Sequence, residues 1–331
     1  MSAAPLRLGF LGVGWIGRHR MQALLESGLA EAAAIAEPSP DCLAEAAKLA
    51  PQAARFASLD ELLEQPLDGV VIATPSAAHA SQTIAALQRG LPVFCQKPLG
   101  RHAGEVAAVL EAAQAANRRL GVDLSYRHLA GMAELRKRLD AGALGRIYAM
   151  RLVFHNAYGP DKAWFYDRTL AGGGCVMDLG IHLVDLALWL LHRPSVLGVD
   201  ARCYAGGRPL GEQPGKVEDY ASGRIDLEGN ISVELDCSWN LAIGVDAEIG
   251  MRIHGTDGTL SLRNVDGSFY DFVVEHFRGR EREVLAEPPD AWGGRAALAW
   301  ARALQADRAY DPSAGELLDV ARVIDRFYAP T

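Results

Sequence analysis

Short apolar runs alternate with helical segments through the first 125 residues of this 331-residue chain. Such alternation is typical of a parallel sheet whose strands are joined by crossover helices. Several runs are apolar at consecutive positions, as expected of strands that helices cover on both faces. Strands are expected at residues 6–12, 32–37, 69–74, 92–96 and 119–125, and helices near 17–27, 41–50, 58–64, 77–89 and 103–117. We therefore predict an α/β domain over residues 1–124.

The pattern changes beyond this point, where long segments alternate polar and apolar residues. Turns such as Glu228-Gly229-Asn230 and Thr256-Asp257-Gly258 separate these segments. This alternation predicts antiparallel strands with one face on a core and the other exposed. Helices are expected near 129–141, 178–192, 292–307 and 314–328. Residues 125–331 are therefore predicted to form a second domain of the α+β class.

Composition narrows the function classes. A net charge of −8 argues against a nucleic-acid partner, and no apolar run has the ~18 residues of a membrane span. The five cysteines are widely spaced and contain no CxxC pair, which predicts neither a zinc site nor a disulfide framework. The N-terminus leads directly into the first apolar strand, so no signal peptide is expected. These observations predict a cytoplasmic protein with reduced thiols.

A glycine loop, Gly12-Val13-Gly14-Trp15-Ile16-Gly17, follows the first predicted strand and opens the first predicted helix. In this context glycines let the backbone turn tightly and approach a pyrophosphate at a helix N-terminus. Glu37 ends the second strand, where a carboxylate can bind the adenosine ribose hydroxyls and would repel a 2′-phosphate. NAD is therefore the expected cofactor. NADP is a second candidate, because Arg18 and Ser39 could bind a phosphate.

Lys97 lies at the end of a later predicted strand, within the sequence VFCQKPLG. Pro98 cannot donate to a strand ladder, so the strand is expected to end here. In open α/β sheets, ligands bind beyond the carboxyl ends of the strands. Thr74-Pro75 follows the preceding main strand, so Lys97 and Thr74 are expected on the same sheet edge as the glycine loop. A solvated loop lysine is the alternative, and the isomer of the Lys97-Pro98 bond is left open.

A second constellation occurs in GGGCVMDLGIHLVDLALW, residues 172–189. On an α-helix, Asp178, His182 and Asp185 would lie within roughly 60° of arc on an otherwise largely apolar helix. Burying such groups is costly unless they pair or take part in chemistry. A structural Asp–His pair is the alternative, and a metal site is disfavoured because no further cluster of metal ligands accompanies these residues.

The glycine loop, ATPSAAH, QKP and GGGCVMDLGIHLVDL, in this order, resemble the Gfo/Idh/MocA oxidoreductases. The resemblance implies an N-terminal Rossmann domain and a C-terminal α+β domain with an open-faced, mostly antiparallel sheet. It also implies hydride transfer between NAD(P) and a hydroxyl or carbonyl group of a sugar, cyclitol or sugar acid. By this resemblance Lys97, Asp178 and His182 are catalytic residues. Tyr126 and Arg127 would lie near the substrate, with Arg127 close to both ligands.

One position departs from the family pattern. An acidic residue usually precedes the lysine-proline pair, and here it is Gln96. A glutamine keeps hydrogen bonding but lacks the charge. How the nicotinamide ribose is held is therefore left open.

The expected mechanism assigns a role to each catalytic residue. A histidine titrates near neutrality, so His182 is suited to take the hydroxyl proton as the hydride leaves. Lys97 would stabilise the negative charge that develops on the reacting oxygen, and Asp178 would orient the substrate or the lysine.

The cofactor-binding candidates are Gly12, Gly14, Trp15, Ile16, Gly17, Glu37, Thr74, Pro75, His79, Gln96, Lys97 and Arg127. The substrate-binding candidates are Lys97, Tyr126, Arg127, Asn156, Trp164, Asp178 and His182, with loop packing as the alternative for Asn156 and Trp164.

Two other function classes stay open. One is an enzyme that holds NAD permanently and uses transient oxidation for elimination, epimerisation or glycoside cleavage. The other is a regulator that binds NAD without turnover. The expected partner is a small carbohydrate-like molecule, with no metal. The half-exposed sheet and the family resemblance together predict a homodimer or homotetramer.

Overall fold

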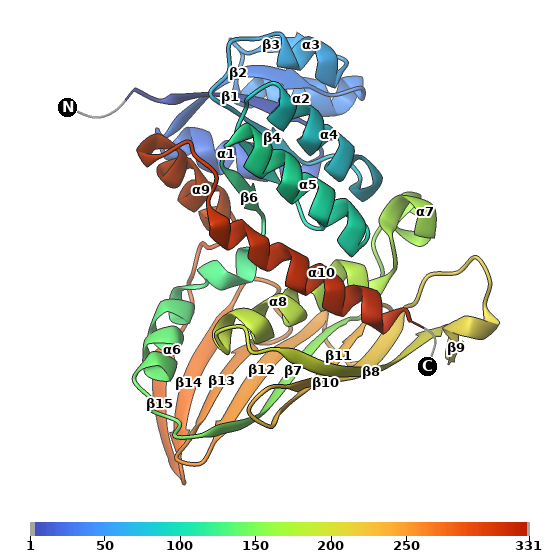
Figure 1. Ribbon diagram of the computed structural model, residues 1–331, viewed down its shortest axis with the longest axis vertical. Coiled ribbons are helices and arrows are strands. Elements are labelled where there is room, and N and C mark those ends of the chain that lie inside the picture. The colour runs from blue at the N-terminus through green and yellow to red at the C-terminus, as the bar shows by residue number, and fades with distance from the viewer. Residues whose placement is uncertain (1–3, 330–331) are drawn as a thin grey trace. The chain divides into compact units, whose positions relative to one another are not determined.

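The computed structural model describes residues 4–329 and divides into two compact units. The first unit holds the chain up to residue 125 together with residues 293–318, and the second holds residues 126–292 and the chain from residue 319. Figure 1 shows both units and labels most of their helices and strands. The predicted fold class is confirmed, because a parallel sheet forms in the first unit and a mostly antiparallel sheet in the second.

The first unit is built on a six-stranded parallel sheet in the order β3-β2-β1-β4-β5-β6. Its strands are β1 (Leu6–Leu11), β2 (Ala30–Ala36), β3 (Ala54–Phe56), β4 (Gly69–Ile72), β5 (Val93–Cys95) and β6 (Leu120–Val122). Its helices are α1 (Trp15–Glu26), α2 (Pro40–Leu49), α3 (Leu59–Leu63), α4 (Ser76–Gln88), α5 (Ala103–Ala116) and α9 (Arg295–Ala306). The order reverses between β1 and β4, which is where this class of sheet binds its ligand.

Local sequence explains several helix starts in the first unit. Ser39 caps α2 by accepting a hydrogen bond from the Cys42 amide, and Pro40 occupies the first helical position. Ser58 and Glu61 form a reciprocal capping box at α3. The short strand β3 was not predicted from the sequence, because its three residues include no buried one.

The second unit is built on a nine-stranded sheet in the order β15-β14-β13-β12-β7-β11-β10-β8-β9. Only the β7–β11 pair is parallel among its described neighbours. The strands are β7 (Ile147–Asn156), β8 (Val196–Ala205), β9 (Arg208–Pro209), β10 (Tyr220–Leu227), β11 (Ile231–Ser238), β12 (Ala247–Gly255), β13 (Thr259–Asn264), β14 (Phe272–Arg278) and β15 (Glu281–Ala286). Helices α6 (Ala130–Asp140) and α8 (Ile181–Leu190) lie on one face of this sheet (Figure 1).

Short helical segments complete the chain. They are η1 (Ser125–His128), η2 (Ala163–Tyr166), α7 (Arg168–Ala171), η3 (Val176–Gly180), η4 (Leu210–Glu212) and η5 (Pro312–Gly315). Helix α10 (Glu316–Phe327) begins in the segment assigned to the first unit and continues in the second. Its buried residues Val320, Val323, Ile324 and Phe327 belong to the core of the second unit.

Two features differ from the sequence-based expectation. Residues 293–318 were expected in the second domain, but Trp300 and Leu304 of α9 pack in the core of the first unit. Trp300 lies against Phe94, with 5.7 Å between ring centroids. The expected helix over residues 178–192 is also not a uniform α-helix, because η3 is a π-helical turn that leads into α8.

One helical run, Arg168–Leu190, is long and apolar enough to cross a membrane. Its most apolar stretch is 89% buried inside the protein, as in the core helix of a globular fold. Leu183, Val184 and Leu186 of this run belong to the core of the second unit. We therefore describe the run as a core helix.

Candidate active site

The glycine loop lies at the carboxyl end of β1 and leads into α1. Gly12 has φ +79°, and a Cβ there would lie 2.7 Å from the carbonyl carbon of Ala73. A Cβ on Gly17 would lie 2.2 Å from the Gly12 carbonyl oxygen, so both positions require glycine. Gly14 is the N-cap of α1 without a side-chain cap, and the first turn holds no acidic residue. This helix start is therefore suited to an anion such as a pyrophosphate.

Glu37 follows β2 beside the same loop. Its carboxylate accepts hydrogen bonds from the backbone amides of Val13 and Ser39, each at 2.9 Å. These contacts fix the carboxylate, and its remaining lone pairs can still accept ribose hydroxyl donors. Arg18 donates to the Val13 carbonyl oxygen at 3.3 Å. The loop, the helix start and the carboxylate together fit an adenosine diphosphate moiety.

Trp15 and Ile16 occupy the two positions between Gly14 and Gly17. Trp15 is 61% exposed and stacks on His19 with 5.9 Å between ring centroids. The contact of Trp15 and Ile16 with a cofactor stays a prediction.

Lys97 follows β5, and its bond to Pro98 is cis. His79 of α4 connects this turn with the end of β4, because its Nδ1 lies 2.6 Å from the Pro98 carbonyl oxygen and its Nε2 lies 2.7 Å from that of Thr74. The Thr74 hydroxyl donates to Gln82 at 2.6 Å, and Pro75 is the N-cap of α4. Burial lowers the pKa of His79, and the two carbonyl contacts oppose that shift. Both ring nitrogens of His79 lie against backbone carbonyl oxygens, so His79 connects these two turns. Its predicted contact with the cofactor stays a prediction.

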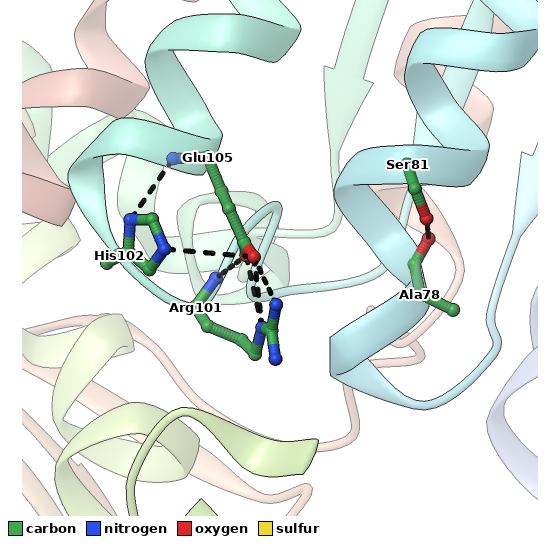
Figure 2. Close-up of polar contacts among 5 residues, drawn as sticks. All are labelled: Ala78, Ser81, Arg101, His102 and Glu105. Carbon is green, nitrogen blue, oxygen red and sulfur yellow. Dashed lines mark hydrogen bonds and ion pairs between the residues drawn. The ribbon is translucent and has the colours of Figure 1, made fainter. Parts of the chain in front are cut away.

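The chain beyond Pro98 is fixed at the start of α5 (Figure 2). His102 is the N-cap and accepts from the Glu105 amide at 3.3 Å. The Arg101 amide donates to Glu105 at 2.7 Å, and the Arg101 guanidinium pairs with the same carboxylate. In α4, the Ser81 hydroxyl donates to the Ala78 carbonyl oxygen at 3.1 Å. The segment that follows the lysine is therefore tied to a helix by several polar contacts.

Gln96 belongs to a buried polar cluster that sequence reasoning did not predict. Its amide nitrogen donates to Asp123 Oδ2, and Arg20 Nε donates to the same oxygen at 2.5 Å. Ser125 donates to Asp123 Oδ1 at 2.8 Å. Arg20, Gln96 and Asp123 are 5%, 7% and 1% exposed. In the sequence, Asp123 is marked only by the apolar residues that precede it. They do not indicate that Arg20 of α1 is its partner.

In the second unit, Asp178 lies on the π-helical turn η3 and His182 on the first turn of α8. The Trp239 indole donates to Asp178 Oδ2 at 3.2 Å. His182 is buried and lies edge-on to the Tyr126 ring, with 4.9 Å between centroids. π-helical turns occur often at functional sites. The sequence did not single out Trp239, which follows β11 and supports the carboxylate of Asp178.

Asp185, the third polar residue of this stretch, pairs with Arg127. Arg127 Nε donates to Asp185 Oδ2 at 2.8 Å, and Nη2 donates to Oδ1. The guanidinium also lies over the Trp189 ring, 5.5 Å from its centroid. This two-bond pairing orients Arg127. Its predicted contacts with cofactor and substrate stay predictions.

Tyr126 is 8% exposed and packs among aromatic rings, including Phe154, Phe272 and Trp292. Burial raises the pKa of its hydroxyl, and Asp178 adds to this shift. Trp164 stacks on Phe165, with 3.8 Å between centroids. Asn156 ends β7, and its backbone carbonyl accepts from the Leu241 amide at 3.0 Å. None of these contacts tests the predicted substrate role.

The glycine run ahead of Asp178 packs on Glu218. The Glu218 Oε1 atom accepts from the amides of Gly174 at 2.8 Å and Val176 at 3.0 Å, and from the Tyr328 hydroxyl at 2.8 Å. A Cβ on Gly174 would lie 1.9 Å from the Glu218 carbonyl oxygen. Burial raises the pKa of this carboxyl group. The sequence did not single out Glu218, because an acidic residue in a loop beside a strand is expected to be exposed.

No group of three or more His, Cys, Asp and Glu residues within 4–329 is arranged to hold a metal ion. The residues of the first unit fit a dinucleotide. The glycines have no side chains that would keep a pyrophosphate from the backbone, and the positive N-terminus of α1 carries no side-chain cap. Glu37 supplies the acceptor that the adenosine ribose needs.

Comparisons with known proteins agree with this geometry. The family model described as "Oxidoreductase family, NAD-binding Rossmann fold" matches residues 6–124, and the model of the Gfo/Idh/MocA C-terminal domain matches residues 132–261. The chain is 31% identical to 1,5-anhydro-D-fructose reductase of Ensifer adhaerens over 63% of this chain and 61% of that protein. It is 31% identical to inositol 2-dehydrogenase of Leifsonia xyli subsp. xyli, over 74% of this chain and 70% of that protein.

A solved structure shares the fold. Levoglucosan dehydrogenase in complex with NADH and L-sorbose superposes with a TM-score of 0.83 at 24% identity, over 98% of this chain and 96% of that chain. The family models together cover most of the sequence, and the relatives are reductases and dehydrogenases. The chain therefore belongs to the Gfo/Idh/MocA oxidoreductases and is an NAD-binding enzyme of that family.

Proposed function

We propose that this oxidoreductase transfers a hydride between NAD and a carbon that carries a hydroxyl or carbonyl group in a sugar, cyclitol or sugar acid. The observation that carries the proposal is the polar turn of the second unit. Asp178 is held by the indole of Trp239, and His182 follows one turn later beside Tyr126. Aromatic faces and a carboxylate suit the rings and hydroxyls of carbohydrates. The named substrates of two relatives, 1,5-anhydro-D-fructose and inositol, are polyhydroxylated molecules.

We assign the reaction roles to three side chains. NAD, when bound, accepts or gives the hydride at its nicotinamide ring. In the oxidative direction, His182 takes the proton that leaves the substrate hydroxyl. Lys97 donates a hydrogen bond to the reacting oxygen and stabilises its developing negative charge. Asp178 accepts hydrogen bonds from substrate hydroxyls and orients them.

The remaining assignments extend this proposal. Gly12, Gly14, Trp15, Ile16, Gly17 and Glu37 would hold the adenosine diphosphate half of the cofactor, and Thr74, Pro75, Gln96 and Arg127 its nicotinamide half. His79 acts as a positioning residue for the turns at Thr74 and Pro98. Tyr126, Arg127, Asn156 and Trp164 would contact the substrate. We propose that residues 1–124 serve the cofactor and residues 125–331 the substrate, with 293–318 as the exception noted above.

Cell location and assembly belong to the same proposal. We expect a cytoplasmic enzyme, since NAD-dependent turnover requires a pool of exchangeable cofactor. The half-exposed sheet of the second unit offers a face for a second copy of the chain, so we expect a homodimer or homotetramer. Light scattering at micromolar concentration tests the assembly, and a pure monomer contradicts it.

The decisive experiment is an NADH-absorbance screen of aldoses, inositols, anhydro sugars and sugar acids, with NAD and NADP in parallel. We expect reduction of NAD by at least one polyol or sugar, and a loss of kcat of about 10²-fold or more in Lys97→Ala. Lys48→Ala is the matched control, because Lys48 is an exposed lysine that pairs with Glu45 of its own helix. Unchanged turnover in Lys97→Ala would remove the role assigned to Lys97.

The same screen separates the other function classes. An enzyme with permanently held NAD would copurify with its cofactor and give no net NADH. A regulator would bind NAD and turn over none of the compounds. Either result would replace the dehydrogenase proposal.

A further inference from the structure

A buried ion pair lies next to Gln96, the residue that precedes Lys97. Arg20 comes from α1, Gln96 follows β5 and Asp123 follows β6, and all three are at least nine-tenths buried. Removing two charges from water is costly even when they pair. The proposed reaction gives no role to Asp123. Its position beside the lysine turn therefore calls for an explanation.

The hydrogen bonds define the orientation of the Gln96 amide. Asp123 Oδ2 accepts from both Arg20 Nε and Gln96 Nε2. A carboxylate paired with a guanidinium can only accept hydrogen bonds, so it can bind the amide nitrogen of Gln96 but not its carbonyl oxygen. Ser125 satisfies the other carboxylate oxygen at 2.8 Å. The Gln96 carbonyl oxygen therefore has one fixed direction, away from Asp123.

The place of Gln96 in the sheet indicates what that oxygen meets. Glu37 follows β2, on the half of the sheet that takes the adenosine end of a dinucleotide. Gln96 follows β5, on the other side of the switch between β1 and β4, where the nicotinamide end lies. A ribose hydroxyl in that half is a donor that needs a fixed acceptor.

We propose that Asp123 is a positioning residue, which fixes the Gln96 amide so that its carbonyl oxygen accepts a hydrogen bond from the ribose of the nicotinamide half of NAD. The inference rests on the proposed function for the placement of the cofactor. It assigns to Asp123 and Gln96 together the acceptor that binds this ribose. Arg20 keeps the carboxylate charge compensated within the buried cluster.

The test compares Gln96→Glu with the exchange variant Gln96→Glu/Asp123→Asn, using binding alone. The single variant places a second carboxyl group at hydrogen-bond distance from Asp123, where neither carboxylate can donate a hydrogen bond to the other. The exchange variant restores one donor and one acceptor with the roles reversed, and leaves one carboxylate beside Arg20. The probes are NADH, ADP-ribose and ADP. ADP lacks the second ribose and serves as the control ligand.

We expect Gln96→Glu to bind NADH and ADP-ribose about 10-fold more weakly and ADP unchanged. The exchange variant should return to within about threefold of the wild-type affinities. Gln96→Leu, which leaves the Arg20–Asp123 pair intact, replaces Gln96→Glu if that variant does not fold, and should show the same selective loss. Unchanged NADH affinity in the single variants overturns the inference. Equal weakening of ADP, or an exchange variant as weak as the single one, also overturns it.

Failure of the proposed function gives a different result. Wild-type protein that binds NADH but turns over none of the screened compounds refutes the reaction, while the selective binding losses would still support the role of Asp123. Turnover without these losses refutes the inference alone.

Discussion

Each compact unit contains a buried carboxyl group that contacts a segment next to a proposed catalytic residue. Asp123 and Glu218 are each 1% exposed. Asp123 contacts Gln96, the neighbour of Lys97 in the chain. Glu218 contacts the backbone of Gly174 and Val176, just ahead of Asp178. Each group therefore contacts a segment next to a residue to which we assign a catalytic role.

The two sites differ in how the charge is accommodated. Asp123 lies against a guanidinium and uses both of its oxygens. Glu218 Oε1 accepts three hydrogen bonds, while its Oε2 is buried without a partner among the described residues. Burial raises the pKa of Glu218. Burial of an oxygen without a partner disfavours the ionised carboxylate relative to the neutral acid, which is the direction in which the pKa is shifted.

The difference shows that a buried carboxyl group can support a site in two ways. As the anion of an ion pair, Asp123 depends on its charge. Glu218 acts as an acceptor through a single oxygen, Oε1, and depends on the position of that oxygen. The same chemical change, acid to amide, should therefore cost much more stability at Asp123 than at Glu218.

The largest effect is expected for Asp123→Asn. The substitution leaves Arg20 buried without a compensating anion, which should lower the free energy of unfolding by about 3–5 kcal/mol. Urea denaturation measures this change. Asp226→Asn is the control, because Asp226 pairs with Arg224 at the surface and should lose less than about 1 kcal/mol. A similar small loss at both positions would show that the buried pair is not charge-dependent.

A smaller loss is expected for Glu218→Ala. It removes the acceptor of two backbone amides and the Tyr328 hydroxyl, and should cost about 2–4 kcal/mol by the same measurement. Glu218→Gln keeps an acceptor oxygen and should cost less than about 1 kcal/mol. We also expect the alanine variant to lower kcat, because the turn that carries Asp178 loses its support, and the glutamine variant to retain it. A glutamine variant as damaged as the alanine variant would mean that the charge of Glu218 matters after all.

The strands and helices of the first unit were predictable because each carries its own local signal. The apolar runs predict β1, β2, β4, β5 and β6, and Gly12 to Gly17 indicate the ligand edge. The position of α9 was not predictable, since an amphipathic helix does not encode which core it joins. Trp300 contacts Phe94, about two hundred residues earlier in the chain.

The candidate site shows the same limit. Lys97, Asp178 and His182 were identified from short motifs. Asp123, Glu218 and Trp239 were not, because their importance lies in partners distant in the sequence. Asp185 was noticed as a costly buried acid, but its partner Arg127 emerges only in the fold. A single sequence carries no record of such pairings.

The smallest effect concerns the pH dependence of stability. Because burial raises the pKa of Glu218 above its usual value of 4.5, the folded protein holds this proton more tightly than the unfolded chain. The resulting stabilisation is complete below about pH 4.5 and is lost as the pH rises through the folded pKa. Glu218→Gln has no such proton and should not show this loss.

We therefore expect the free energy of unfolding of the wild type to fall relative to that of Glu218→Gln as the pH rises from 4.5. Urea denaturation of both proteins at a series of pH values measures the difference, and subtraction removes the titration of the other groups. A falling difference supports a pKa of Glu218 that is higher in the folded protein than in the unfolded chain. Parallel curves would mean that Glu218 ionises alike in both states, and a rising difference would mean that the folded protein favours its ionised form.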